Sequence, residues 1–301
     1  MSAPDYEDLL LRTSRTFALS IPLLEEPVRR QVTLAYLLFR IADTFEDASV
    51  WPKDARRDGL LDFCAWLDEL PPEEDARATL ERLLDPPPTD HEGYLDLLRH
   101  TVDVVGAYRE LEPVAREAVR LHTQRTCRGM AEFVERAHPD GSLELRDLAD
   151  LKNYCYVVAG IVGEMLTDLF LASSAQLQPI EARLREKAAT FGEALQLVNI
   201  LKDRADDREE GRTFLPPSVD RDDVFALARR DLEVARSYVL LLQEAGAPRG
   251  DVAFTALPVR LAQEALDVVE SEGAGAKVGR GRVLEIVKSL HEDLDAARPA
   301  V

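Results

Sequence analysis

Two stretches of the sequence are apolar on almost every face of a helix, namely Val32–Ala42 and Tyr154–Leu171. A helix of this kind has no side to turn to water, so it belongs in the centre of a helical bundle. Polar side chains stranded on a central helix need partners, because burying an unpaired charge is costly. The sequence therefore predicts a large helical core, and it directs the search for chemistry to the polar residues on central helices.

The rest of the chain also favours helices. Glycine and proline are sparse and lie at breaks, while Ala, Leu, Glu and Arg fill the stretches between them. No alternating strand pattern, glycine-rich nucleotide loop or linker interrupts this organisation, so we expect one all-α domain over residues 1–301. The predicted helices lie near 27–48, 54–69, 73–84, 91–107, 110–137, 144–173, 179–208, 221–245, 251–271 and 280–297.

Charge and cysteine content exclude several classes of function. The net charge of −19 argues against nucleic-acid binding, which needs clustered Lys and Arg. The three cysteines, Cys64, Cys127 and Cys155, show no pairing pattern, which suits a reducing cytoplasm. The N-terminus has no signal-peptide pattern, and no run approaches the roughly 18–20 apolar residues of a membrane span. We therefore expect a cytoplasmic protein.

The first apolar stretch ends in two aspartates one helical turn apart, Asp43 and Asp47, whose carboxylates share one face. Tyr36 and Arg40 lie on the same face, so the helix has a polar stripe on an otherwise buried rod. Two carboxylates at this spacing suit Mg²⁺, which takes its other ligands from water and substrate phosphate. Spacing alone does not establish a metal site, because a face that looks merely solvated has the same interval, at Asp54, Asp58 and Asp62.

The same design recurs about 160 residues later, where an apolar helix bears a stripe of Gln196, Asn199, Asp203 and Asp207. If the two helices face each other, four carboxylates surround one cavity. Such a group needs cations, because like charges repel and raise one another's pKa. Bound Mg²⁺ and an anionic substrate would resolve this conflict.

Four blocks of the sequence resemble the motifs of the squalene/phytoene synthase family, with bacterial squalene synthase-like proteins closest in motif. The resemblance covers most of the chain and is specific in order and spacing. The blocks are Thr13–Phe17, Arg40–Asp47, Tyr154–Glu164, and Gln196–Asp203 continuing to Gly211–Pro216.

The resemblance implies an all-α isoprenoid-synthase bundle with a central cavity. Mg²⁺ would bind at its mouth, and prenyl tails would occupy its apolar end. Relatives condense two prenyl diphosphates head to head through a cyclopropylcarbinyl diphosphate, and squalene-forming members then use a hydride from NADPH. Gly160 and Gly163 interrupt the second apolar stretch, either to leave room for the prenyl chain or to let another helix pack closely.

The resemblance also suggests roles for single residues. Arg40 is a candidate diphosphate ligand, with a structural ion pair to Asp43 or Glu46 as the alternative. Glu46 either joins the metal cluster or points away from it. Tyr154 matches a tyrosine that steers the cation or moves a proton; the alternative is a core tyrosine with a hydrogen-bonded hydroxyl. The other candidates for diphosphate binding are Arg15, Tyr36, Gln196, Asn199, Lys202 and Arg212.

Farnesyl diphosphate is the favoured substrate, because the Asp43–Asp47 motif is closer to squalene synthases than to phytoene synthases. Phytoene or dehydrosqualene synthesis is the alternative, and a non-catalytic lipid-binding or assembly subunit is a third possibility. Leu261–Leu266 lacks a tyrosine that relatives use for diphosphate. The sequence shows no hydrophobic tail like that of anchored squalene synthases, so we expect transient, peripheral membrane contact. Nothing in the sequence indicates the oligomeric state.

Overall fold

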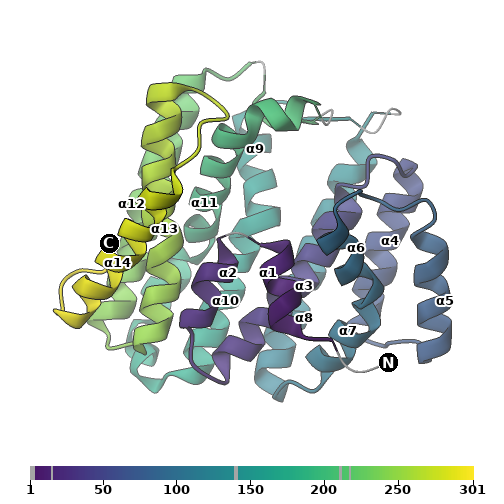
Figure 1. Ribbon diagram of the computed structural model, residues 1–301, viewed down its shortest axis with the longest axis horizontal. Coiled ribbons are helices and arrows are strands. Elements are labelled where there is room, and N and C mark those ends of the chain that lie inside the picture. Colours follow the sequence, from purple (N-terminus) through teal and green to yellow (C-terminus); the bar gives the residue numbers. More distant parts are fainter. Residues whose placement is uncertain (1–3, 15, 139–141, 210–211, 217) are drawn as a thin grey trace. The chain divides into compact units, whose positions relative to one another are not determined.

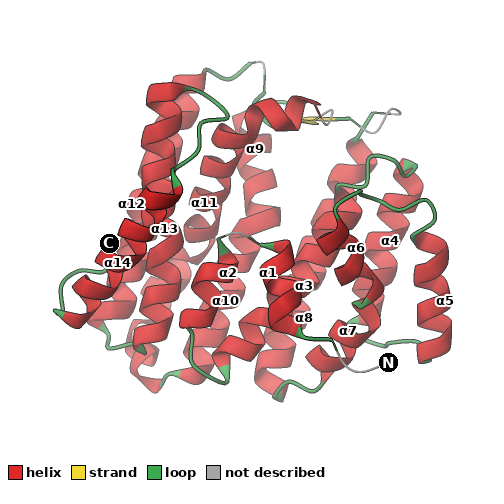
Figure 2. Ribbon diagram, in the orientation of Figure 1, coloured by secondary structure: helices red, strands yellow, loops and turns green. Residues whose placement is uncertain are grey.

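The computed structural model describes residues 4–14, 16–138, 142–209, 212–216 and 218–301, with the backbone alone at 204–209 and 212. The chain forms two compact units. Unit 1 comprises Met1–Ala18 and Arg29–Leu143, and unit 2 comprises Leu19–Val28 and Glu144–Val301. Most of the described residues of both units are helical and there is essentially no sheet among them (Figures 1 and 2), so the predicted all-α fold is confirmed.

Side chains cap some of the helices of unit 1 at their N-termini. Asp5 caps the short first helix by accepting hydrogen bonds from the N–H groups of Glu7 and Asp8. The helix expected near 91–107 is broken at His100, where φ is −97° and ψ is 11°. The helices of unit 1, with two that reach its borders, are α1 (Tyr6–Thr13), α2 (Phe17–Ser20), α3 (Val28–Glu46), α4 (Lys53–Trp66), α5 (Glu73–Leu83), α6 (Glu92–Arg99), α7 (Thr101–Arg109) and α8 (Pro113–Arg136).

Helix α3 supplies much of the core of unit 1. Its residues Leu37, Leu38 and Ile41 are 0% exposed. On the same face, Phe45 packs edge-on against Phe63 of α4, with ring centroids 6.1 Å apart. The expectation that this apolar stretch is buried is therefore confirmed.

Unit 2 contains the second apolar stretch. Asp147 and Asp220 cap two of its helices through their side-chain oxygens. Its elements are η1 (Ile21–Leu23), α9 (Leu148–Cys155), the π-helical turn η2 (Tyr156–Gly160), α10 (Ile161–Ser173), η3 (Ala175–Ile180), α11 (Glu181–Glu209), α12 (Arg221–Glu244), α13 (Arg249–Glu272) and α14 (Arg280–Asp295). Two-residue strands, β1 (Leu143–Glu144) and β2 (Arg212–Thr213), pair with each other.

Helix α11 contacts α9, η2, α10, α12 and α13 and is the centre of unit 2. It approaches η2 and α10 through glycines. A Cβ on Gly163 would lie 2.0 Å from the carbonyl oxygen of Ala188, and one on Gly192 would lie 1.9 Å from that of Ala159. Backbone atoms cannot yield as flexible side chains can, so neither position has room for a larger residue. Close helix packing therefore accounts for Gly163.

The continuous helical stretch Leu148–Ser173 has 26 residues and is long and apolar enough to cross a membrane, by length and composition alone. No stretch of this kind was expected from the sequence. Within the fold, 61% of its most apolar window is buried, as in the core helix of a globular unit.

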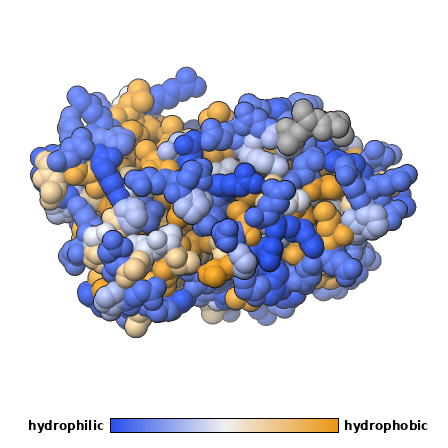
Figure 3. All heavy atoms as spheres, turned by 90° about the horizontal axis from the view of Figure 1, so that it is seen from below, coloured by the Kyte–Doolittle hydropathy of each residue, from blue (hydrophilic) through white to orange (hydrophobic). Residues whose placement is uncertain are grey.

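On the face shown in Figure 3, hydrophilic side chains predominate and hydrophobic residues form separate patches between them. Among the described residues, the large hydrophobic side chains that are exposed are Leu11, Leu19, Val50, Leu61, Val114, Leu121 and Leu284.

Candidate functional site

The first aspartate motif lies at the C-terminal end of α3. The N–H of Asp47 donates to the carbonyl of Asp43 (2.9 Å), so helical bonding continues one residue past the end of the helix. The Asp43 side chain is 33% exposed and Asp47 is exposed. Both carboxylates are thus accessible from the same face of the helix, as predicted.

Glu46 lies in a different environment from the two aspartates. Its residue is only 3% exposed, and its carbonyl oxygen accepts a hydrogen bond from Nε of Arg56 (2.8 Å). The buried side chain does not share the accessibility of Asp43 and Asp47. Its place in a metal cluster stays a prediction.

Arg40 is held by several contacts. Its guanidinium forms an ion pair with Asp43, and its Nε donates to the Tyr36 hydroxyl (3.4 Å). Burial alone would lower the pKa of Arg40, but Asp43 and the neighbouring tyrosines outweigh it, and the pKa is raised. The ion pair named as the alternative role of Arg40 is therefore present, and it lies on the predicted stripe.

Tyr36 connects this stripe to the N-terminal block. Its hydroxyl donates to the carbonyl of Thr13 (2.7 Å), and its ring packs against Phe17 with centroids 5.5 Å apart. Arg15, predicted as a diphosphate ligand, lies outside the described residues.

Tyr94 of α6 is a member of this cluster that sequence reasoning missed. Its ring centroid is 5.2 Å from Cζ of Arg40, close to the 5.8 Å distance for the Tyr36 ring. Burial is the largest effect on the pKa of Tyr94 and raises it. Arg40 acts in the opposite direction, and the nearby Asp43 and Asp47 add to the rise. No local sequence signal could have found Tyr94, because only folding brings α6 against α3.

The second motif lies on α11 in unit 2. Lys202 Nζ forms an ion pair with Asp203 (3.2 Å) and donates to Oδ1 of Asn199 (3.2 Å). Gln196 is half-buried on the same helix. Asn199, Lys202 and Asp203 therefore form one local network. Asp207 and Arg212 have side chains outside the described residues, and the predicted facing of the two motifs stays a prediction.

Tyr154 lies in the core of unit 2. The residue is 4% exposed, and its ring stacks on Phe214 with centroids 4.7 Å apart and planes at 27°. The N–H of Leu145 donates to the carbonyl of Thr213 (3.2 Å), so the segment after α11 contacts the chain both just before α9 and near the C-terminal end of α9, at Tyr154. This environment fits a core tyrosine; a chemical role for Tyr154 stays a prediction.

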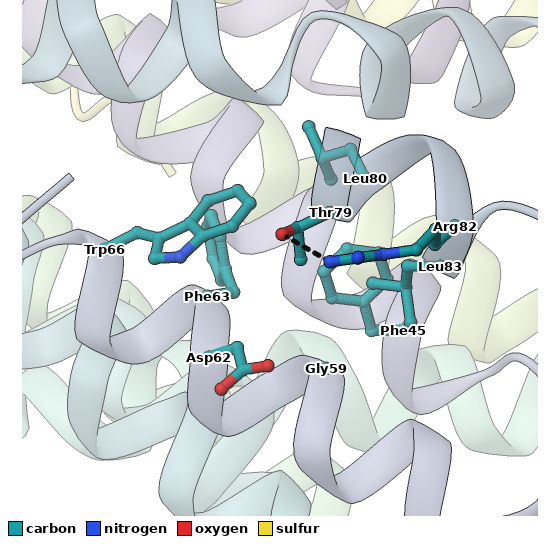
Figure 4. A pocket seen from close by; sticks show the side chains of 9 residues that line it. All are labelled: Phe45, Gly59, Asp62, Phe63, Trp66, Thr79, Leu80, Arg82 and Leu83. Atoms are coloured by element: carbon teal, nitrogen blue, oxygen red, sulfur yellow. Dashed lines mark hydrogen bonds between the residues drawn. The ribbon is translucent and has the colours of Figure 1, made fainter. Parts of the chain in front are cut away.

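A cavity of about 280 Å³ in unit 1 lies away from these residues. Phe45 contributes to its wall from the side of α3 opposite Asp43. Asp62 and Arg82 occupy separate walls (Figure 4), and Arg82 donates to the Thr79 hydroxyl (3.1 Å). Asp54 and Asp58 are exposed and form ion pairs with Arg57, which supports their interpretation as a solvated face.

The residues of α3 fit a magnesium ion as partial ligands. Among the described residues, no three or more His, Cys, Asp or Glu side chains form a group that could hold a metal. Mg²⁺ commonly takes only one or two carboxylates, with water and substrate phosphate completing its octahedron. Asp43 and Asp47 meet this need, and Arg40 already shows that Asp43 attracts a cation.

Comparison with known proteins gives a consistent result. A family model described as squalene/phytoene synthase matches residues 10–222. A Botryococcus braunii squalene synthase is 29% identical over 70% of this chain and 42% of its own length. A squalene synthase of Saccharomyces cerevisiae is 30% identical over 70% of this chain and 45% of its own length. The chain thus spans less than half the length of these curated relatives.

Solved structures support the same fold. TcSQS in complex with the ligand E5700 has a TM-score of 0.76 at 24% identity, covering 94% of this chain and 84% of that one. A dehydrosqualene synthase in complex with a ligand has a TM-score of 0.65 at 19% identity, covering 97% and 95%. The predicted isoprenoid-synthase fold is therefore confirmed.

Proposed function

The chain belongs to the squalene/phytoene synthase family, and from this premise we propose that it condenses two prenyl diphosphates head to head. One observation carries the proposal. Helix α3 is buried along its apolar faces and has an accessible polar stripe in which Arg40 and Asp43 already form an ion pair. That stripe has both the cation and the carboxylates that a metal–diphosphate complex requires.

Each residue of the stripe has a defined task in this mechanism. Asp43, Asp47, Asp203 and Asp207 are the proposed Mg²⁺ ligands, and the bound ion would neutralise charge on the departing diphosphate. Arg40 orients diphosphate oxygens through its planar, multiply donating guanidinium. On α11, Lys202 supplies a second positive charge beside Asp203 (3.2 Å). Loss of diphosphate from one substrate then leaves an allylic cation.

Apolar surroundings protect that cation from water. The double bond of the second molecule attacks it, the cyclopropane ring closes with loss of a proton, and a second ionisation and rearrangement follow. Tyr154 is the proposed residue that steers the cation or moves the proton. Burial and stacking hold its ring in place, because the residue is 4% exposed and the ring packs against Phe214.

Farnesyl diphosphate is the proposed substrate, with presqualene diphosphate as the intermediate and squalene as the product when NADPH supplies the hydride. The squalene synthases among the relatives support this choice. Phytoene or dehydrosqualene synthesis is the alternative, and it is favoured by the dehydrosqualene synthase among structures of the same fold. We place the enzyme in the cytoplasm, with transient membrane contact to release a hydrocarbon that water does not dissolve.

The test is to supply farnesyl and geranylgeranyl diphosphate separately, with and without Mg²⁺ and NADPH. Pyrophosphate release is followed, and the hydrocarbon is identified by mass spectrometry. We expect Mg²⁺-dependent release from farnesyl diphosphate, with squalene formed only when NADPH is present. Phytoene from geranylgeranyl diphosphate, or dehydrosqualene from farnesyl diphosphate, would select the alternative.

A folded protein that released no pyrophosphate from any prenyl diphosphate would contradict the enzymatic function. It would instead support the non-catalytic lipid-binding or assembly subunit.

A further inference from the structure

Tyr94 contacts the predicted diphosphate site from a separate helix. Its ring and that of Tyr36 both lie near Arg40, with centroids 5.2 and 5.8 Å from Cζ. Both distances fall within the roughly 6 Å range over which an aromatic face attracts a cation. The guanidinium of Arg40 therefore has two uncharged aromatic neighbours in addition to its ion pair with Asp43.

Local structure fixes the position of the Tyr94 ring. Its backbone N–H donates to Nδ1 of His91 (3.3 Å), which caps α6, and the two rings lie 4.1 Å apart at 30°. The preceding residue is glycine for a steric reason, since a Cβ on Gly93 would lie 2.5 Å from the carbonyl oxygen of Arg12. This close approach of α6 to α1, together with the cap, holds Tyr94 beside Arg40.

The contacts of Arg40 differ in how they respond to a metal ion. A cation taken up by Asp43 competes with the guanidinium for the same carboxylate and repels it. The ring faces of Tyr36 and Tyr94 do not bind Mg²⁺, which prefers oxygen ligands, so their attraction for Arg40 persists. The two rings would therefore keep the Arg40 guanidinium beside the polar stripe when Asp43 binds a metal ion.

We propose that Tyr94 is a positioning residue that holds Arg40 in place for diphosphate once Asp43 binds the metal. This proposal rests on the proposed function, because it assigns Tyr94 to the same site. The ring carries the effect. Within the described residues the Tyr94 hydroxyl makes no hydrogen bond, and burial keeps the phenol protonated by raising its pKa.

The ring hypothesis makes phenylalanine and leucine variants differ. Binding of inorganic pyrophosphate in the presence of Mg²⁺ is measured by calorimetry, which needs no turnover. Tyr94→Leu should weaken binding about tenfold, a change within the usual range for a cation–π contact. Tyr94→Phe keeps the ring and should bind within about twofold of wild type. Equal losses in both variants would overturn the ring hypothesis.

A double-mutant cycle tests whether Tyr94 acts through Arg40. Because the two effects share one pathway, Tyr94→Leu/Arg40→Ala should bind no more weakly than Arg40→Ala alone. Fully additive losses would show that Tyr94 acts independently of Arg40, against the proposal.

Tyr6→Leu is the matched control. Tyr6 is a partly buried tyrosine of α1 whose hydroxyl donates to the carbonyl of Asp103 (3.2 Å), a residue outside the proposed site. Its variant should bind pyrophosphate like wild type, and thermal unfolding of all variants checks their folding. If wild type binds no pyrophosphate with Mg²⁺, the proposed function fails. If wild type and Tyr94→Leu bind it equally, only the role of Tyr94 fails.

Discussion

Asp43 pairs with Arg40 from the preceding turn of α3, so the first aspartate motif contains its own counter-charge. Such a pair, with both side chains partly exposed, contributes little to stability. Because the pair lies on an otherwise buried helix, it points to a role in function rather than in folding. A metal ion at Asp43 would compete with this contact, which would make the arginine available to an anionic ligand.

Loss of either aspartate motif should stop the reaction without unfolding the protein. We expect Asp43→Ala and Asp203→Ala each to lower pyrophosphate release from farnesyl diphosphate more than about a hundredfold. Groups that only support metal ligands already contribute 10–100-fold. Asp58→Ala is the control, because Asp58 is exposed and paired with Arg57 (2.8 Å). Near-normal activity of either motif variant, with an unchanged circular dichroism spectrum, would refute the metal assignment.

Glycine at the crossing of α10 and α11 should be essential for stability. A Cβ at position 163 would lie 2.0 Å from the carbonyl oxygen of Ala188, so Gly163→Ala should lower the free energy of unfolding by about 1–3 kcal/mol or more. The control is Gly106→Ala in α7, where a Cβ would meet no atom within 4 Å. It should stabilise the protein by about 0.5–1 kcal/mol through helix propensity. Urea unfolding measures both; equal effects of the two variants would contradict the steric argument.

Asp251 should make stability fall as the pH rises. The residue is 2% exposed, and burial, with a smaller effect of Glu25, raises its pKa to about 7. The unfolded carboxyl titrates near pH 3.9. Between about pH 4 and pH 7 the folded state therefore retains a proton that the unfolded state has lost, and the free energy of unfolding decreases across this window.

Asp251→Asn tests this prediction, because the amide is neutral at every pH. The variant should gain stability relative to wild type between pH 5 and pH 8, by up to about 3 kcal/mol. Urea unfolding at both pH values is the measurement. Parallel changes in wild type and variant would show that Asp251 does not titrate in this window.

The cysteines should be unreactive in the folded protein. Cys64, Cys127 and Cys155 are all buried, and burial raises the pKa of each thiol, so little thiolate is present at pH 8. A thiol reagent such as dithionitrobenzoate should label all three only after unfolding in guanidinium. Rapid labelling of any of them under native conditions would contradict their burial.

Strong periodic patterns located most of the helices. The expected helix at 27–48 is observed as Val28–Glu46, and that at 221–245 as Arg221–Glu244. Short elements escaped, because the eight residues of α1 carry too little pattern. The break at His100 escaped as well, since its backbone conformation has no proline or glycine to announce it. The single-domain organisation stays a prediction beside the two compact units.

Some residues of the candidate site could be predicted from the sequence and others could not. The stripe Tyr36–Arg40–Asp43 could be predicted because helical periodicity places these residues on one face, and the structure joins them through hydrogen bonds and an ion pair. Tyr94 could not be predicted, because its contact with Arg40 joins two helices separated by more than forty residues. The buried position of Glu46 also had to come from the structure, since the spacing to Asp43 fits either environment.

Local sequence patterns were enough to show that this chain is helical, that Val32–Ala42 and Tyr154–Leu171 belong to its core, and which helix faces are polar. These properties follow from local periodicity and from the cost of exposing apolar surface. The folded chain was needed to explain why Gly163 must be glycine, how Tyr154 stacks on Phe214 and that Tyr94 lies beside Arg40. Each depends on the distance between segments remote in sequence, which the packing of whole helices sets and no local pattern records.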